Sequence, residues 1–325
     1  MHPWNEPVFA SLKRRLETLP HALLLHGPRG VGKLALAERI AQLVLCEAAD
    51  AARRPCGTCD GCRWFLGGNH PDFRRLEPEI LAKAPAESDE DAPAPARGAK
   101  PSHDIKVDQV RALADFLNIG SHRGRRRVAL VHPAEDMNPS AANALLKGLE
   151  EPPAGAMFIL VAHRPARLLP TIRSRCVAVP VPVPDRDAAL AWLSGQGIKD
   201  ANRWLPYAGG APLQALEYAS KADALDRLLG SIQQRAQILV DDREGLEALA
   251  EALQKVALDR ALAGFGFPAK YGTQLPTAAS AKARDWLTFA RQMGQNRALS
   301  RHPLNGRLFA AEMLAAMPSD KPSRS

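Results

Sequence analysis

The sequence predicts an α/β domain with a parallel sheet, followed by a region built only from helices. Short apolar runs alternate with helical patterns over the first half of the chain, which is typical of parallel strands connected by helices. A glycine-rich loop links the first apolar run to a helix. After Pro184 the apolar residues recur only at helical spacing. A chain of 325 residues has room for two or three such domains.

The first strand and helix enclose the glycine-rich loop. Residues 4–19 have apolar side chains on one helical face, residues 21–26 (HALLLH) form an apolar strand, and residues 34–46 form a helix. Strand, loop and helix in this order are the context that a phosphate-binding loop requires.

The loop itself, GPRGVGK, matches the pattern G-x-x-x-x-G-K. Its glycines let backbone N–H groups converge on phosphates, and a lysine can neutralise them. The candidate nucleotide-binding residues are therefore Gly27, Gly30, Gly32 and Lys33. The next residue is Leu34, where a Ser or Thr hydroxyl would ligate Mg²⁺. The motif leaves two interpretations open, a loop that binds nucleotide and a vestigial loop, and it disfavours hydrolysis.

Four of the five cysteines lie within seventeen residues, at Cys46, Cys56, Cys59 and Cys62. Four thiolates with a C-x2-C-x2-C core suit a closed, tetrahedral, structural zinc site. His70 is an alternative ligand, and a buried apolar cysteine is the alternative for Cys46. Crowded cysteines in a reducing compartment favour metal over disulfides.

The middle of the chain continues the α/β pattern. Strands are expected at residues 70–76, 128–131 and 157–162, with a helix at 105–117. Residues 83–101 are rich in Ala, Pro and acidic side chains, and we expect them to be a disordered insertion. Residues 177–183 alternate valine with proline, which indicates a connector or a short edge strand. Helices are then expected at residues 187–193, 201–207, 213–219, 224–240, 245–262, 278–293 and 304–317.

The segment Val128–Pro153 is the main puzzle. Its strand leads into a helix that the double proline ends. An ATPase would place an acidic pair at this strand tip to hold Mg²⁺ and orient water. This chain has His132-Pro133 there.

Composition and charge limit the kinds of partner and the cellular location that the chain can have. The net charge of +8 and pI of about 9.4 permit polyanion binding, although a diffuse excess of arginine also keeps a protein soluble. The run Arg123–Arg127 either contacts phosphates or, as the residues favour, is a solvated turn. The N-terminus lacks the apolar core of a signal peptide, and no run is long enough to span a membrane. A cytoplasmic protein is expected.

Five segments together resemble the AAA+ clamp-loader subunits of bacterial DNA polymerase III, and most closely the delta-prime family. They are HALLLHGPRGVGK, the inserted cysteines, His70-Pro71-Asp72, AANALLKGLEEPP and LLPTIRSRC. The resemblance covers residues 1 to about 210. It implies a RecA-like AAA+ domain (1–165) that contains the zinc module (46–62), a helical lid (166–208) and a helical collar (209–325) that joins five subunits in a ring.

The resemblance also implies residue roles. Arg175, in Ser174-Arg175-Cys176, matches the family's arginine finger, which reaches the ATP of a neighbouring gamma/tau subunit. His132-Pro133 falls where hydrolysing subunits carry Asp-Glu. Ala162-His163 takes the place of the polar sensor, and Leu213 that of the sensor arginine. The lost groups predict a subunit that does not hydrolyse ATP by itself.

The expected role is therefore a ring member that helps gamma/tau and delta subunits load the sliding clamp on primed DNA, as part of the DNA polymerase III holoenzyme. ATP binding by this chain stays open, and one structural Zn²⁺ is expected. Two alternatives remain. An active gamma/tau-type ATPase is supported by Lys33, and a zinc-dependent DNA-binding module by the cysteines and the positive charge.

Overall fold

A computed structural model describes residues 1–82, 101–119, 126–236, 238, 240, 242–273, 282–300 and 305–318. The chain divides into two compact units, Met1–Val183 and Pro184–Ser325. The insertion expected to be disordered, residues 83–101, lies outside the described residues except for Pro101. None of the described helices is long and apolar enough to cross a membrane.

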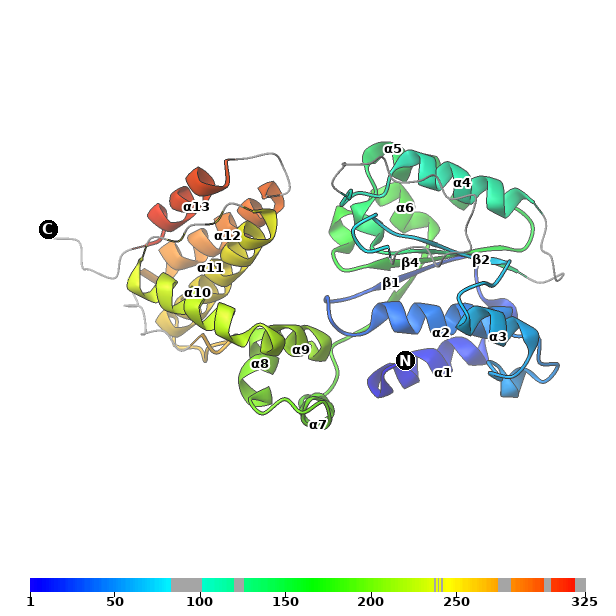
Figure 1. Cartoon of the computed structure of the whole chain (residues 1–325), viewed down its shortest axis with the longest axis horizontal. Coiled ribbons are helices and arrows are strands. Elements are labelled where there is room, and N and C mark those ends of the chain that lie inside the picture. Colours follow the sequence, from blue (N-terminus) through cyan, green and yellow to red (C-terminus); the bar gives the residue numbers. More distant parts are fainter. Residues whose placement is uncertain are drawn as a thin grey trace, which may run out of the picture. The chain divides into compact units, whose positions relative to one another are not determined.

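A five-stranded parallel sheet forms the centre of the first unit, with strand order β2-β3-β4-β1-β5 (Figure 1). Its strands are β1 (Ala22–His26), β2 (Phe73–Leu76), β3 (Arg127–Val131), β4 (Ala156–Ala162) and β5 (Val177–Pro180). Every residue of β3 and β4 is buried, because helices cover both faces of the sheet. The expected parallel α/β architecture is confirmed.

Helices α1 (Glu6–Arg14), α2 (Lys33–Leu45) and α3 (Asp60–Leu66) lie on one side of this sheet (Figure 1). The other side carries α4 (Val107–Asn118), α5 (Pro139–Glu150) and α6 (Pro170–Arg175), whose apolar side chains share one core cluster with the strands.

Short 3-10 turns complete the unit: η1 (Pro3–Asn5), η2 (Leu16–Thr18), η3 (Ala51–Arg53), η4 (Ala134–Asp136) and η5 (Pro165–Arg167). The single helix expected over residues 4–19 is therefore interrupted, and α3 is a helix that the sequence patterns did not predict. At seven residues, α3 is too short to show a helical period.

Proline protects the outer edge of the sheet. Val181 donates its N–H to His26 of β1 at 2.8 Å. Successive residues of a strand point their N–H groups to opposite sides, so the positions that face away from β1 include Pro180 and Pro182. Proline has no N–H to donate, which prevents a further strand from pairing here. The expectation for residues 177–183 is confirmed in both forms, since an edge strand runs directly into a connector.

The second unit contains seven helices among its described residues: α7 (Arg186–Gly195), α8 (Ala201–Tyr207), α9 (Pro212–Ser220), α10 (Ala222–Gln234), α11 (Arg243–Gly264), α12 (Ala283–Leu299) and α13 (Gly306–Ala315). No strand occurs in the part of this unit that the structure describes, as expected. Helix α10 ends six residues before the predicted position, because Arg235 takes the left-handed conformation that terminates helices.

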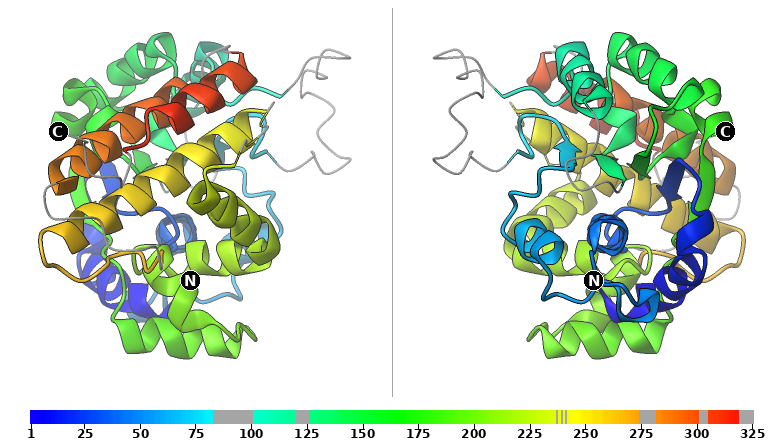
Figure 2. Two further views of the ribbon diagram at one scale, coloured as in Figure 1. Left: turned by 90° about the vertical axis from the view of Figure 1, so that its left-hand side faces the viewer. Right: turned by 90° about the vertical axis from the view of Figure 1, so that its right-hand side faces the viewer.

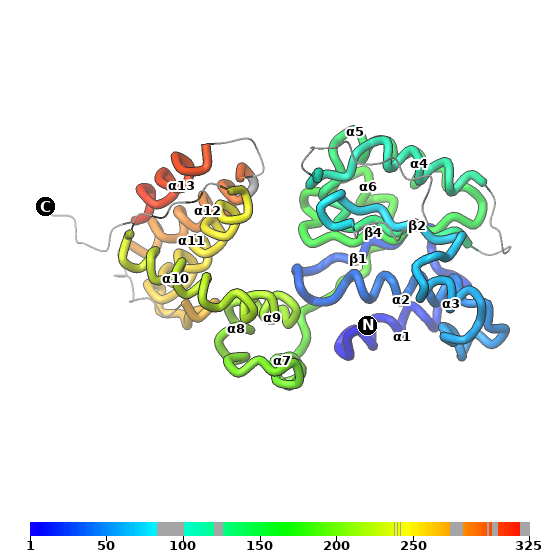
Figure 3. Tube along the Cα trace, viewed as in Figure 1, coloured from blue at the N-terminus to red at the C-terminus, as the bar shows by residue number. Residues whose placement is uncertain are grey.

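Two apolar cores organise these helices. One joins α7, α8 and α9 around Trp204, and the other joins α11, α12 and α13 around Trp286. Figure 2 shows α11, α12 and α13 running side by side, and Figure 3 follows the same path as a tube. A partly buried polar contact connects the two groups: the Tyr218 hydroxyl of α9 donates to Glu251 of α11 at 2.6 Å.

Candidate functional site

The glycine-rich loop lies between β1 and α2 and is tightly packed. A Cβ atom on Gly27 would stand 2.1 Å from the carbonyl oxygen of Val181, so a side chain cannot fit there. Gly32 has φ +83°, a left-handed conformation that favours glycine, and it caps the N-terminus of α2. The structure therefore forms the strand, loop and helix arrangement that the sequence predicted.

Lys33, the first residue of α2, is buried and folds back on its own loop. Its Nζ donates to the carbonyl oxygens of Gly27 at 2.7 Å and Pro28 at 2.5 Å. Burial lowers the pKa of Lys33 to about 8, against the opposing charge of Glu135. The ammonium thus occupies a satisfied position inside the loop.

The N-terminal segment supports the loop from outside. Trp4 Nε1 and Asn5 Nδ2 each donate to the carbonyl oxygen of Val31 at 3.0 Å, and Asn5 Nδ2 also reaches Gly32 at 3.3 Å. The ring of His2 stacks on Trp4 at 4.8 Å. Sequence reasoning missed the three hydrogen bonds to the loop, because each joins residues 26 or 27 positions apart without a local pattern.

Two imidazoles stand at the strand tips beside the loop. His132 follows β3 and His163 follows β4, and their rings meet edge to face with centroids 5.3 Å apart. Burial and then the ammonium of Lys33 lower the pKa of His132 to about 4 and that of His163 to about 2. Both rings are therefore neutral near pH 7. Neutral nitrogen ligands suit Mg²⁺ poorly, because this cation prefers oxygen.

The nearby carboxylate of Glu135 has a structural partner. Its Oε1 accepts the backbone N–H groups of His163 at 2.8 Å and Arg164 at 2.9 Å, which ties η4 to the tip of β4. Burial raises the pKa of Glu135. Within the described chain, the buried Glu135 Oε2 and the Nδ1 atoms of His132 and His163 have no hydrogen-bond partner.

Arg175 lies at the opposite end of the strands from the loop, where β1 and β5 begin. It is the last residue of α6 and comes just before β5 begins at Val177, which pairs with Leu23 near the start of β1. The loop that holds Lys33 follows the opposite end of β1. Because a strand rises about 3.3 Å per residue, the length of β1 separates Arg175 from the loop. Next to it, burial raises the pKa of Cys176 to about 11, so that thiol is an inert core group.

The Arg175 guanidinium is partly exposed and has partners in its own chain. Nη2 pairs with Glu150 Oε1 at 2.7 Å, and Nη1 donates to the carbonyl oxygen of Thr171 at 2.9 Å. The exposed fractions of the Arg175 and Glu150 side chains are 34% and 47%. The group can therefore reach solvent by rotating its side chain.

The four cysteines converge at the end of α2. Cys46 follows that helix, Cys59 caps α3 and Cys62 lies within it. Their Sγ atoms all lie within 4.8 Å of one another, with Cys46 3.6 Å from Cys56 and 3.8 Å from Cys59. Zn–S bonds of about 2.3 Å place tetrahedral sulfurs about 3.8 Å apart, so the cluster could hold a metal ion and is compatible with zinc.

Hydrogen bonds and burial act on these thiols in opposite directions. The Thr58 backbone and hydroxyl lower the pKa of Cys56 to about 5, whereas burial raises that of Cys62 to about 12. Four thiolates at this distance need a cation to balance their charge. His70 is not part of the cluster: its Nδ1 accepts the N–H of Asp72 at 3.0 Å, and its ring packs against Trp64.

The basic run leads into β3, and its last residue, Arg127, has a role that differs from both predicted ones. Residues 123–125 lie outside the described part of the chain. Arg127 is buried, pairs with Asp72 Oδ1 at 3.3 Å, donates to the carbonyl oxygen of Phe116 and stacks on the Phe116 ring at 4.7 Å. The expected solvated turn is wrong for Arg127, which compensates a buried carboxylate instead.

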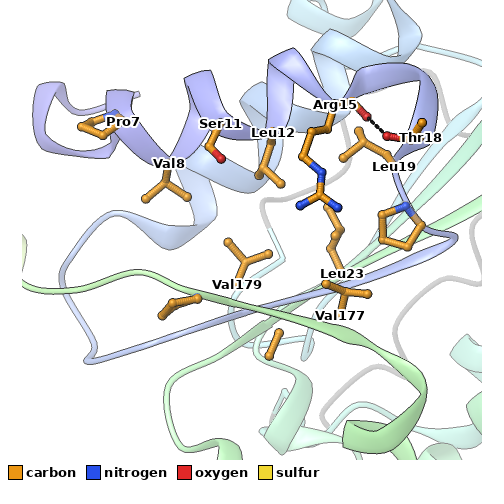
Figure 4. Close-up of a pocket in the computed structure, with 13 residues that line it drawn as sticks. Pro7, Val8, Ser11, Leu12, Arg15, Thr18, Leu19, Leu23, Val177 and Val179 are labelled. Carbon is orange, nitrogen blue, oxygen red and sulfur yellow. Dashed lines mark hydrogen bonds between the residues drawn. The ribbon is translucent and has the colours of Figure 1, made fainter.

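A groove of about 510 Å³ runs between α1 and β5, away from the loop (Figure 4). Apolar side chains such as Leu19, Leu23 and Val177 line it, and Arg15 is the cation among its lining residues. It gathers no cluster of nucleophilic or metal-binding groups, so chemistry is not indicated there.

Comparison with known proteins identifies the family of this chain. A family model described as "DNA polymerase III, delta subunit" matches residues 4–185. A DNA polymerase III subunit delta' from Pseudomonas aeruginosa is 38% identical over 77% of this chain and 67% of its own length. One from Yersinia pestis is 38% identical over 70% of this chain and 61% of its own length.

Among solved structures, a DNA polymerase III gamma subunit-related protein from Thermotoga maritima is 21% identical with a TM-score of 0.47, covering 94% of this chain and 97% of its own. The residues matched by the family model include the glycine-rich loop, the four clustered cysteines and Arg175. The chain belongs to the delta-prime family of DNA polymerase III clamp-loader subunits, with its AAA+ fold.

Proposed function

We propose that this chain is a clamp-loader subunit that does not hydrolyse ATP and that supplies Arg175 to the ATP of a neighbouring subunit. The position of Arg175 carries this proposal. It is partly exposed and lies at the amino ends of the strands, whereas its own glycine-rich loop lies at their carboxyl ends. Any nucleotide that it contacts must therefore be held by another chain. A guanidinium in such a position stabilises the charge that develops on a transferring phosphoryl group.

The strand tips support the absence of hydrolysis. Hydrolysis requires carboxylates that hold Mg²⁺ and orient water. Here two neutral imidazoles stand at the tips of β3 and β4, Glu135 is bound to backbone amides, and Leu34 offers no hydroxyl. Lys33 donates to two carbonyl oxygens of its own loop. The absence of hydrolysis does not depend on whether this loop binds nucleotide.

The partners follow from the family. The chain would join gamma/tau and delta subunits in a five-membered ring and act on the sliding clamp and primed DNA through that ring. We propose that the helices after Pro184 form a lid followed by a collar. The first domain, expected to end at residue 165, instead extends to Val183, because α6 packs in its core and β5 pairs with β1. The four cysteines would hold one structural Zn²⁺, which cross-links the end of α2 to α3.

Reconstitution tests the proposal. The complex assembled with Arg175→Ala should keep its composition but lose about 10³-fold or more of the rate at the ATP site that Arg175 serves. Arg175→Lys should rescue little, because an ammonium lacks the forked donors. Unchanged ATPase and clamp-loading rates in the assembled Arg175→Ala complex would reject the role.

The rival with a specific observation in its favour is an active ATPase, because Lys33 and the loop glycines are present. The purified chain alone distinguishes the two functions. ATP turnover by this chain that disappears in Lys33→Ala would establish the rival, and no turnover above background is expected.

A further inference from the structure

The resting partner of Arg175 is a carboxylate of its own chain. We propose that Glu150 is the internal counter-ion of Arg175, which positions the guanidinium and gives it up when a neighbour's ATP arrives. This inference rests on the proposed function. It adds a positioning residue that would set how readily the finger transfers to phosphate.

The backbone fixes the two groups as a pair. Glu150 is the last residue of α5 and Arg175 is the last residue of α6, and these helices pack against each other. Leu149 and Ile172 anchor the two helix ends in the same core cluster. The 2.7 Å contact therefore depends on two side chains that extend from firmly packed helices. Moving the guanidinium requires side-chain rotation and no change of fold.

The pair is weak enough to exchange. Both side chains are partly exposed, and ion pairs in such settings shift equilibria by about two- to five-fold. A triphosphate carries several negative charges and accepts both arms of a guanidinium, so it can replace a single carboxylate oxygen. Thr171 and Ser174 hold the other arm, Nη1, through a carbonyl oxygen at 2.9 Å and a hydroxyl at 3.5 Å. The Glu150 contact on Nη2 would thus be the charged interaction that competes with ATP.

Glu151 provides a matched control. It follows Glu150 directly, is exposed and makes no ion pair within the described part of the chain. Glu150→Gln and Glu151→Gln remove the same charge from the same surface. A general change in surface potential would affect both variants equally, whereas loss of the counter-ion affects only the first.

The test measures ATPase kinetics of the reconstituted complex at several ATP concentrations. Glu150→Gln should lower the apparent KM for ATP about two- to five-fold relative to Glu151→Gln, with kcat changed by less than two-fold. The difference should shrink at high ionic strength, because salt screens exposed pairs. Glu150→Asp, which keeps the charge, should behave more like the wild type than Glu150→Gln does.

A double variant separates this inference from the function on which it rests. If Glu150 acts through Arg175, Glu150→Gln should have no further effect in the Arg175→Ala background. Equal kinetics of Glu150→Gln and Glu151→Gln, or an effect that persists without Arg175, would overturn the counter-ion role while leaving the finger intact. An Arg175→Ala complex with normal kinetics would instead overturn the proposed function.

Discussion

Charged side chains have different partners at the two ends of the parallel strands. At the carboxyl ends of the strands, Lys33 donates to its own loop and Glu135 accepts from backbone amides. At the end where the strands begin, Arg175 is partly exposed and pairs with a single carboxylate. The charged groups at the carboxyl ends are hydrogen-bonded to the backbone of the same unit, while the guanidinium at the amino ends can turn toward a partner. Under the proposed function, the loop end of the strands has a structural role, and the contribution to another subunit's ATP site lies at the opposite end of the strands.

The largest expected effect concerns the helix that starts at the P-loop. Helix α2 leads from Lys33 to the cysteine cluster. Losing a metal ligand there should therefore destabilise this helix and the first unit. Cys56→Ser should reduce bound zinc from about one equivalent per chain to near zero and cost on the order of several kcal/mol of unfolding free energy.

Metal analysis and urea unfolding measure this effect. Cys176→Ala is the matched control, since it removes a thiol that lies outside the cluster and should keep the metal. Four free thiols and no metal in the wild-type chain would contradict a zinc site.

The next effect is a loss of stability in acid. His132 and His163 have pKa values of about 4 and about 2 in the folded chain, below the ordinary value of 6.5. The unfolded chain therefore binds protons more readily, so their contribution is complete above pH 6.5 and is lost as pH falls toward 4. About 3 kcal/mol should be lost for each imidazole between pH 6.5 and pH 4.

Unfolding curves at pH 7 and pH 4.5 check the acid effect. The positive charges of Lys33 and Arg29 drive it along with burial. Glu135, with its raised pKa, and Asp136 oppose it. A double variant with His132→Asn and His163→Asn should lose less stability between these pH values than the wild type. Equal losses in the two proteins would show that the imidazoles are not the groups responsible.

The smallest effect should come from the support beneath the loop. Asn5→Leu removes the donors to the carbonyl oxygens of Val31 and Gly32 and should cost about 1–3 kcal/mol of unfolding free energy. ATPase activity of the complex should stay within about two-fold of the wild type. A large loss of activity in an assembled complex would mean that the loop end is functional, and the contrast between the two ends would fail.

Local patterns were enough to predict much of the fold and the position of several site residues. The apolar run of β1, the helix α8 and the spacing of the four cysteines are all legible over a few residues. The pairing of Asp72 with Arg127 was not predictable, because it joins residues far apart in the sequence. An arginine in a basic run reads as exposed until the buried carboxylate opposite it is known.

The same limit applies to the chemistry of the site. The sequence showed that carboxylates are missing from the tip of β3, but not that two histidines from different strands meet there. It placed Arg175 in a motif, but the partner Glu150 became visible only when α5 and α6 packed together. Contacts between elements depend on register and packing, which local patterns do not encode.

The most direct test compares the two ends of the strands in one assay. Complexes containing Arg175→Ala or Lys33→Met are assembled side by side, their composition is verified, and their ATPase rates are measured. We expect the rate to fall strongly with Arg175→Ala and to stay within about two-fold of the wild type with Lys33→Met. A normal rate with Arg175→Ala and a strong loss with Lys33→Met would contradict the account.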